Sequence, residues 1–562
     1  MRGRWSRLAW PAGFAVGGIV LFLAYLLQSS RSTNVNSDGA SNALQAWAML
    51  HGNVLLHGWS LSDVSFYTTE LPQYALVEAV RGLTPEVVHI CGAMTYALLV
   101  VFAAVLAKGR STGRKALVSV AVAASCIMTP QLGNPAAMVL LSPDHVGTGV
   151  PLLVIWILID RTDWLAGPAE ADGDGRPRRD GWLRWAVPAA VCLLLAWTAV
   201  GDQLAEVVAA VPLVLTCALR VLRARFRGVR LRNLGYELSL GVAAMLSVPL
   251  AWLGVKLVTA LDGWTITAPR TGLAAPGVLG RNLSLTGSGL LQLFGADFFR
   301  EQSGVEDVFS VIHMAGLALA ACGLFLAVRR FFGQQLIVQV LTVAIAVNIA
   351  AYIFTVQAEN IATTREIAAV LPFGAVLAGR LLADPLLGVR PEQRPEQSVT
   401  HARVSPNRLL AGSVAVLALF LCYGAMLGYN ATRPMPAEQI PAAQVAKLAS
   451  WLKAHGFTRG VGGYWLSNSV TLDTGGAVQV RAIDINQDEL INGGYWEADS
   501  SWYDPRSAYA DFVLTVPPPW HPREPGVLIR HMEQVAGKPV KIYRFDGYQI
   551  ALWRQNLLTK LG

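Results

Sequence analysis

The sequence predicts a polytopic α-helical membrane protein with about eleven transmembrane helices and a C-terminal extracytoplasmic α/β domain. Its 562 residues are 53% hydrophobic and only 15% charged, whereas an average soluble protein carries roughly 25% charged residues. The charges are absent from long apolar stretches and concentrated in the joints between them. Lysine and arginine fill alternate joints, as is typical of cytoplasmic loops. This composition excludes a disordered chain, a coiled coil and an ordinary soluble enzyme.

Each expected span has about 20 predominantly apolar residues, the length that crosses a bilayer core of about 30 Å. The spans are expected at 10–28, 87–107, 115–130, 145–160, 184–200, 204–222, 236–258, 308–328, 335–356, 366–383 and 409–428. The basic residues before the first span resemble the start of a signal peptide. However, its apolar run is long and its far end offers a poor cleavage site, so we expect an uncleaved anchor.

The basic joints set the expected orientation in the cell membrane. With eleven spans, the N-terminus and all joints rich in arginine fall on one side, which is the cytoplasm. The tail 429–562 then lies outside. The run from Arg220 to Arg232 could by itself bind RNA or anionic lipid. Its place in a cytoplasmic joint explains it without a further function, and we therefore expect no nucleic-acid partner.

The chain is expected to form two domains, a transmembrane module at 1–428 and a soluble domain at 429–562. The first outside loop, 29–86, is predicted to hold interfacial amphipathic helices at 39–51 and 71–83, with Ser37 or Asp38 at the first N-cap. The tail is predicted to combine a helix with several strands, two of which flank Asp546-Gly547, a typical hairpin turn. These elements are expected at 443–455, 478–483, 511–516, 540–545 and 548–553.

Acidic residues are so few outside the membrane that each can be weighed as a catalyst. Asp38 lies about ten residues beyond the first span, where an interfacial helix begins. A carboxylate held there could take a proton from a sugar hydroxyl or bind a divalent cation. The plain alternative is that Asp38 only caps its helix.

Two short motifs resemble the GT-C class of integral-membrane glycosyltransferases. One is Asn36-Ser37-Asp38-Gly39-Ala40 after the first span. The other is Thr363-Thr364-Arg365-Glu366, which runs into the apolar segment that ends at Arg380. The resemblance implies inverting transfer of a hexosyl or pentosyl group from a polyprenyl-phosphate sugar, with the acid of the first loop, Asp38, as general base. The phosphate leaves with negative charge, which an arginine or a metal ion would stabilise. Arg365, at the outside end of a span, is the candidate, and Arg270, Arg281 and Arg300 are alternatives. Arg365 could instead form only an ion pair with Glu366 or Glu359.

The sequence departs from that class at one position. Many members carry a second acid beside the first, but the neighbours of Asp38 are Gly39 and Ala40. A cation such as Mg²⁺ or Mn²⁺ would then need a second ligand from elsewhere, and Asp144 is the candidate. The reserve acids are Asp63, Glu70 and Asp202. The aromatic residues that could stack on sugar rings are Trp59, Tyr67, Trp496 and Trp502. The tryptophans of the stretch 493–503 could equally anchor the tail at the membrane interface.

The leading hypothesis is a bacterial enzyme of the cell envelope, suggested as bacterial by its Ala, Gly and Arg content. It would act on a lipid-linked sugar and a glycan, lipid or protein acceptor. One alternative is a transporter or flippase of a lipid-linked sugar, which would predict an internal repeat and charges deep in the spans. The other is a non-catalytic membrane protein whose tail binds an envelope partner. No P-loop is present, which argues against ATP-driven export.

Overall fold

The computed structural model describes most of the chain. The described residues are 2–32, 35–131, 140–141, 145–166, 182–229, 234–268, 271–299, 304–389, 406–433, 441–485, 491–493, 496–515 and 527–561. They divide into two compact units. The first comprises 1–28, 93–252 and 270–433, and the second comprises 29–92, 253–269 and 434–562. The second unit therefore combines the first outside loop with the tail.

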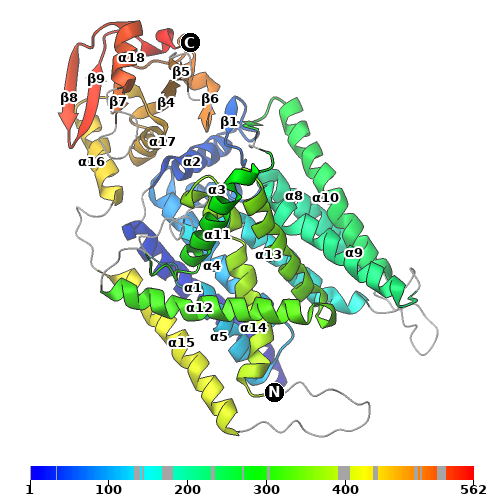
Figure 1. The fold of residues 1–562 in the computed structure, drawn as a ribbon. Helices are drawn as coiled ribbons and strands as arrows, with labels where there is room; N and C mark the ends of the chain where they lie inside the picture. Colours follow the sequence, from blue (N-terminus) through cyan, green and yellow to red (C-terminus); the bar gives the residue numbers. More distant parts are fainter. Residues whose placement is uncertain are drawn as a thin grey trace. The chain divides into compact units, whose positions relative to one another are not determined.

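The first unit is helical (Figure 1). Four of its helices precede residue 163: α1 (Arg2–Ser32), α4 (Glu86–Lys108), α5 (Gly113–Ile127) and α7 (Val146–Thr162). The later α-helices are α8 (Leu183–Gly201), α9 (Val211–Phe226), α10 (Gly235–Ala260), α11 (Leu279–Leu293), α12 (Val305–Arg329), α13 (Leu336–Phe354), α14 (Val370–Leu386) and α15 (Pro406–Thr432). Among the short segments between them are the π-helical turn η2 (Glu206–Ala210) and the 3₁₀ segment η6 (Ile361–Ile367).

Eight helices in the described part of the chain are long and apolar enough to cross a membrane, or nine if the bent pair η6 and α14 is one span. The expected spans 115–130 and 145–160 are also helical, but α5 and α7 have only 15 and 17 residues. Both are shorter than the roughly 20 residues that a bilayer core requires. The multi-pass membrane architecture is confirmed, whereas the count of eleven stays a prediction.

Helix α14 forms the centre of the first unit. It packs against α5 and α12, and the residues from Val370 to Gly379 are buried. Small residues permit this close packing, since a Cβ on Gly379 would lie 2.5 Å from the Ser119 carbonyl oxygen. Glycine at helix crossings allows backbones to approach closely when no hydrophobic effect drives helices together in lipid.

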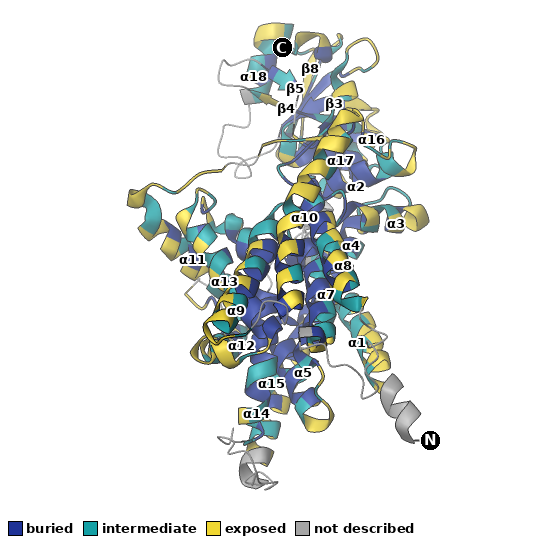
Figure 2. Ribbon diagram, turned by 90° about the vertical axis from the view of Figure 1, so that its right-hand side faces the viewer, coloured by how far each residue is buried: buried dark blue, intermediate teal, exposed yellow. Residues whose placement is uncertain are grey.

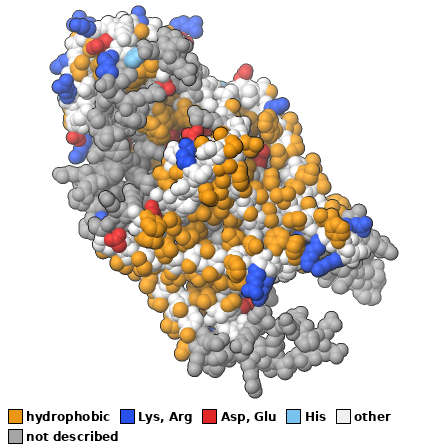
Figure 3. Space-filling view, in the orientation of Figure 1, with side chains coloured by type: hydrophobic (Ala, Val, Ile, Leu, Met, Phe, Trp, Pro, Cys, Tyr) orange, Lys and Arg blue, Asp and Glu red, His pale blue; other side chains and the backbone are white. Residues whose placement is uncertain are grey.

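The outer faces of the first unit are apolar. Exposed residues run along much of α10 (Figure 2). Hydrophobic side chains cover most of the face of the helical unit in Figure 3, and Lys and Arg gather at its margins. Such a large exposed apolar surface indicates contact with lipid.

The second unit begins with helices α2 (Ser37–Leu50) and α3 (Leu71–Arg81), which pack against each other. Strand β1 (Trp59–Leu61) pairs in parallel with β2 (Thr265–Ile266) and antiparallel with β6 (Ala498–Asp499). This small sheet joins three segments that are far apart in the sequence. Both helices predicted for the first loop are therefore present, within a few residues of their expected bounds.

The tail forms an α/β layer structure around a six-stranded sheet of order β5-β4-β3-β7-β9-β8. Strand β3 is parallel to both β4 and β7, and the other pairs are antiparallel. One face packs on α16 and α17, and the other on α18. The elements are α16 (Pro441–Ala454), β3 (Arg459–Gly462), α17 (Tyr464–Asp473), β4 (Gln479–Ile485), β5 (Ile491–Gly493), β7 (Phe512–Thr515), α18 (Val527–Ala536), β8 (Lys541–Phe545) and β9 (Tyr548–Leu552).

The predicted strands and hairpin of the tail are confirmed. Asp546 and Gly547 have φ of 47° and 85°, and positive φ at both positions is the requirement of a type I′ turn. Strand β3 was not predicted, because its sequence Arg-Gly-Val-Gly has little strand propensity. Gly460 is needed there since a Cβ would lie 2.3 Å from the Phe512 ring.

Candidate functional site

Asp38 lies in the first turn of α2, but it does not cap that helix. Asn36 is the N-cap, and its side-chain oxygen accepts a hydrogen bond of 2.9 Å from the Gly39 amide. The expectation that Ser37 or Asp38 caps the helix is therefore wrong, because the helix begins at Ser37 rather than at Gly39. A neighbouring amide satisfies the helix start, so the Asp38 carboxylate can turn to another partner.

That partner is Tyr464, the first residue of α17. The Tyr464 hydroxyl lies within hydrogen-bonding distance of both Asp38 Oδ1 and Glu497 Oε2. Glu497 is 2% exposed, and Asp38 and Tyr464 are partly buried. Burial, followed by the charges of Glu497 and Asp38, raises the pKa of Tyr464 well above its usual value. The phenol therefore stays protonated, and Asp38 becomes part of a group of three side chains.

Two further contacts join α2 to α17 beside this group. The Ser37 hydroxyl donates to the Tyr464 carbonyl oxygen. The Asn468 amide donates to the Ser41 hydroxyl at 2.7 Å and also lies 3.4 Å from the Glu497 carbonyl oxygen. The start of α2 is thus bonded to α17 through the Tyr464 carbonyl oxygen and through the side chains of Tyr464 and Asn468, which fixes the direction of the Asp38 carboxylate.

Neither Tyr464 nor Glu497 was predicted from the sequence, although Glu497 lies within the aromatic stretch 493–503. One signal could have found both, because Gly-Gly-Tyr-Trp occurs twice in the tail, at 462–465 and 493–496. Tyr464 belongs to the first copy, and Glu497 directly follows the second. In each copy the tryptophan is exposed, at 56% for Trp465 and 37% for Trp496.

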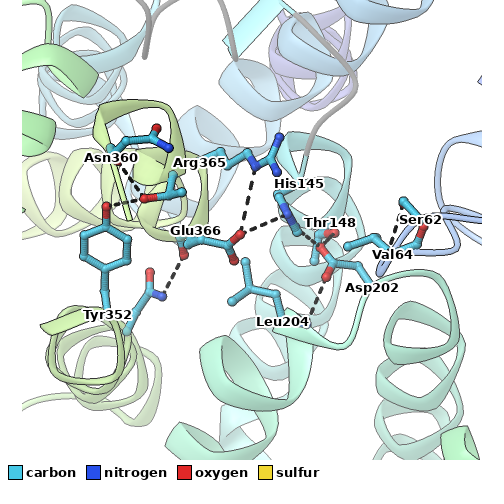
Figure 4. A network of polar contacts seen from close by, with 12 residues as sticks. Ser62, Val64, His145, Thr148, Asp202, Leu204, Tyr352, Asn360, Arg365 and Glu366 are labelled. Atoms are coloured by element: carbon cyan, nitrogen blue, oxygen red, sulfur yellow. Dashed lines mark hydrogen bonds and ion pairs between the residues drawn. The ribbon is translucent and has the colours of Figure 1, made fainter. Parts of the chain in front are cut away.

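A second cluster of charged residues lies in the first unit (Figure 4). His145, in a left-handed conformation with φ of 52°, directly precedes α7. Its Nδ1 lies 3.0 Å from Asp202 Oδ2, and its Nε2 lies 3.4 Å from Glu366 Oε1. The cluster therefore joins the start of α7 to the turn after α8 and to η6.

Asp202 is the most buried member of this cluster. Its side chain is 1% exposed, and it accepts hydrogen bonds from the Thr148 hydroxyl at 2.5 Å and the Leu204 amide at 2.9 Å. Burial alone would raise the pKa of Asp202, but the charge of His145 and these hydrogen bonds outweigh burial and hold the pKa below its usual value. A neutral imidazole has only one N–H, so carboxylates at both ring nitrogens favour a protonated His145.

Arg365 lies at the edge of the same cluster. Its Nε is 4.0 Å from Glu366 Oε1, and its side chain is 34% exposed. The preceding residues are ordered by local bonds, since Tyr352 and Thr363 share a hydrogen bond of 2.8 Å and Asn360 caps η6. With His145 and Thr148, Arg365 lines a cavity of about 20 Å³ whose other walls are mainly apolar. That volume holds about one water molecule.

The reserve acids and aromatic candidates have varied surroundings. Asp63 lies in the loop after β1, and Glu70 is buried directly before α3. Tyr67 packs near Trp264 with its hydroxyl on the Val54 carbonyl oxygen. Trp59 is 3% exposed and packs edge-on against Trp502, whose ring also lies 3.7 Å from the Arg481 guanidinium. Trp59 is therefore closed to a sugar, and the exposed Trp496 is the better candidate for stacking.

The structure brings no metal-ligand set together among the residues that it describes. No three His, Cys, Asp or Glu side chains in that part of the chain are arranged to hold a metal ion. Asp144, the predicted partner of Asp38, lies outside the described residues. The described residues alone thus do not form a cation site, and the divalent cation stays a prediction.

Solved structures with the same architecture were found by structural comparison. ArnT from Cupriavidus metallidurans bound to undecaprenyl phosphate is 12% identical, with a TM-score of 0.51 over 97% of this chain and 98% of that chain. Its apo structure is 13% identical, with a TM-score of 0.51 over 99% of both chains. The archaeal oligosaccharyltransferase AglB from Archaeoglobus fulgidus, in complex with an inhibitory peptide and a dolichol-phosphate, is 11% identical, with a TM-score of 0.50 over 88% of this chain and 69% of that chain.

These similarities concern the fold, because the sequence identities are low. No protein-family model and no curated protein sequence matches the chain. The likeness to ArnT extends over nearly the whole of both chains, and so includes both the helical unit and the tail.

Proposed function

We propose that this chain, which has the fold of the GT-C glycosyltransferases, is an inverting glycosyltransferase that uses a polyprenyl-phosphate sugar. The observation that carries the proposal is the Asp38 carboxylate, which is held by Tyr464 rather than used as a helix cap. The reaction takes place on the outer face of the cell membrane, and the N-terminus is cytoplasmic. Nucleotide sugars are not available outside, so the donor is lipid-linked.

Asp38 acts as the general base in this mechanism. A hydroxyl oxygen of the envelope acceptor attacks the anomeric carbon of the donor sugar, and Asp38 takes the hydroxyl proton. The bond between the anomeric carbon and the phosphate oxygen breaks with inversion, and the polyprenyl phosphate leaves with the electron pair. Transfer of a proton to a positioned base contributes about 10²–10⁴-fold to such rates.

Arg365 stabilises the negative charge that develops on the leaving phosphate. Glu366 has its shorter contact with His145, at 3.4 Å, and its longer one with Arg365, at 4.0 Å. The Arg365 side chain is 34% exposed, so a phosphate group can reach it. Guanidinium groups bind phosphate oxygens through paired hydrogen bonds, and fixed positive groups are most effective where charge develops in the transition state.

The test is a transfer assay in membranes with a panel of labelled polyprenyl-phosphate sugars. The variant Asp38→Asn keeps the size of the side chain and removes the base, so we expect a loss of about 10²–10⁴-fold in kcat/KM. Asp504→Asn is the matched control, because Asp504 belongs to the same unit but bonds locally to Arg506 at the surface. Equal rates for wild type and Asp38→Asn would exclude Asp38 as the base. Absence of product across the donor panel would contradict the enzyme function itself.

A further inference from the structure

The Tyr464 hydroxyl lies between two carboxylates, and this arrangement limits how protons are distributed. The hydroxyl is bonded to both Asp38 Oδ1 and Glu497 Oε2. A phenol carries one proton and can therefore donate to only one carboxylate. The second bond exists only if the other carboxyl group is protonated and donates to the phenol oxygen. The three groups together hold two protons.

Burial strengthens this requirement. Glu497 is 2% exposed, and two ionised carboxylates around one hydroxyl repel each other strongly where water is excluded. Groups so closely coupled lose their protons as a unit rather than one by one. Both bonds to the Tyr464 oxygen are satisfied when one of the two carboxyl groups keeps its proton.

The backbone holds Glu497 in this place. Glu497 has φ of 49°, a left-handed conformation that bulky L-residues adopt only when their surroundings require it. Its carbonyl oxygen lies 3.4 Å from the amide nitrogen of Asn468, which also bonds to Ser41 on α2. The turn that carries Glu497 is thus tied to the same helices that carry Asp38 and Tyr464.

We propose that Tyr464 and Glu497 are positioning residues that keep Asp38 ionised and correctly aimed. Glu497 retains its proton and donates a hydrogen bond to the Tyr464 oxygen, and the Tyr464 hydroxyl donates to the Asp38 carboxylate. No bond breaks within this chain of hydrogen bonds. The inference rests on the proposed function, since it assigns the two residues through Asp38. It also gives the tail a direct part in the reaction.

Other titratable groups surround α2 and must be considered in any pH experiment. Helices α3 and α17 pack against α2, and Val88 of α4 lies against Gly39. Besides Tyr464, the titratable or charged groups on these helices are Tyr74, Glu78, Arg81, Glu86, His89, Cys91, Tyr96, Lys108 and Asp473, and Glu70 directly precedes α3. Burial raises the pKa of Glu78 to about 9, so it is protonated at neutral pH. Burial and the charge of Glu86 raise the pKa of Asp473 to about 7, so differences between variants are more informative than absolute values.

The experiment compares the pH dependence of kcat/KM for the full-length protein in membranes or detergent. Tyr464→Phe removes the donor to Asp38, so Asp38 gains a proton more readily. We expect the acid limb of the profile to move upward by about one pH unit, which is a tenfold loss at low pH. Glu497→Gln keeps a donor facing the Tyr464 oxygen, so we expect a profile within about threefold of wild type.

A second replacement at position 464 has the opposite expected sign. A fluorinated tyrosine is a stronger hydrogen-bond donor, and the acid limb should then move downward. This measurement preserves the ring and the hydroxyl, so it decides the question even if Tyr464→Phe folds poorly. A structural role in packing alone would shift neither limb.

The outcomes separate this inference from the proposed function. If Asp38→Asn is inactive while the profiles of Tyr464→Phe and the fluorinated protein match wild type, the positioning role is wrong and the function stands. If Glu497→Gln is as inactive as Asp38→Asn, Glu497 itself exchanges protons and the inference is again wrong. If Asp38→Asn is fully active, Asp38 is not the base, and the positioning role that depends on it is also wrong.

Discussion

Replacement of His145 by glutamine should destabilise the helical unit, because His145 is the cation between two carboxylates. Its ring nitrogens lie 3.0 Å from Asp202 and 3.4 Å from Glu366. The side chains of His145, Asp202 and Glu366 are 7%, 1% and 19% exposed. Glutamine keeps a polar group of similar reach but leaves Asp202 without the charge of His145.

The magnitude follows from the geometry. At an effective dielectric constant of about 20, unit charges about 3 Å apart attract by about 5 kcal/mol, most of which desolvation offsets. Removal of one partner of a buried ion pair nevertheless costs about 3–5 kcal/mol, because a buried charge is left uncompensated. Asp202 keeps its bonds to Thr148 and Leu204, so we expect the lower end of this range, about 3 kcal/mol.

The pH dependence has a definite sign. The pKa of Asp202 is held below its usual value in the native protein. Its ionised form therefore contributes stability above the unfolded pKa of about 3.9, and this contribution is lost as pH falls through the native value. Without His145, burial raises the native pKa of Asp202 instead. The native pKa of His145 is raised well above its usual value, so its own contribution is fully present only below the unfolded pKa of about 6.5. The deficit of His145→Gln should then be largest near about pH 6.5 and shrink toward about pH 5, as protonation relieves the penalty at Asp202.

The assay is thermal unfolding of the purified protein in detergent, with a double-mutant cycle. Asp202→Asn removes the carboxylate, and the double variant His145→Gln/Asp202→Asn removes both charges of the pair. We expect the double variant to unfold at a higher temperature than His145→Gln alone, since no uncompensated charge remains. The reasoning is refuted if His145→Gln melts with wild type at neutral pH, or if the double variant is the less stable of the two.

Three further predictions concern donor binding, acceptor binding and the membrane topology. Arg365→Gln should raise the KM for the lipid-linked donor about tenfold, and Arg365→Lys should raise it less, because lysine keeps the positive charge without the paired hydrogen bonds. An unchanged donor KM would argue against a phosphate contact. Trp465→Ala and Trp496→Ala should each raise the acceptor KM several-fold with little change in kcat, because exposed aromatic rings can line a ligand site. Unaltered kinetics in both variants would contradict the stacking role. A cysteine introduced at the exposed Ser501 should react with a membrane-impermeant maleimide added to intact cells, and protection until the cells are opened would reverse the predicted orientation.

Local sequence signals predicted the elements that depend on near neighbours. Apolar runs of suitable length located the long helices, since a membrane helix must be apolar throughout its crossing. Asp546-Gly547 located the hairpin, because its positive φ angles favour those residue types. The same approach failed for β3, which exists because of Phe512 and the neighbouring parallel strands. It also placed the helix cap at Ser37 or Asp38 instead of Asn36.

The sequence by itself determined that the chain is a multi-pass membrane protein with a strand-rich tail, and it selected Asp38 and Arg365 as candidates. These conclusions rest on composition, periodicity and position along the chain. Only the tertiary structure decided which side chains meet. Tyr464 and Glu497 lie more than 400 residues after Asp38 along the chain, yet the Tyr464 hydroxyl is bonded to both carboxyl groups. No local sequence pattern encodes such a pairing. The low overall charge left few acids to choose from, and long-range folding then gave each acid its own partners and its own degree of burial.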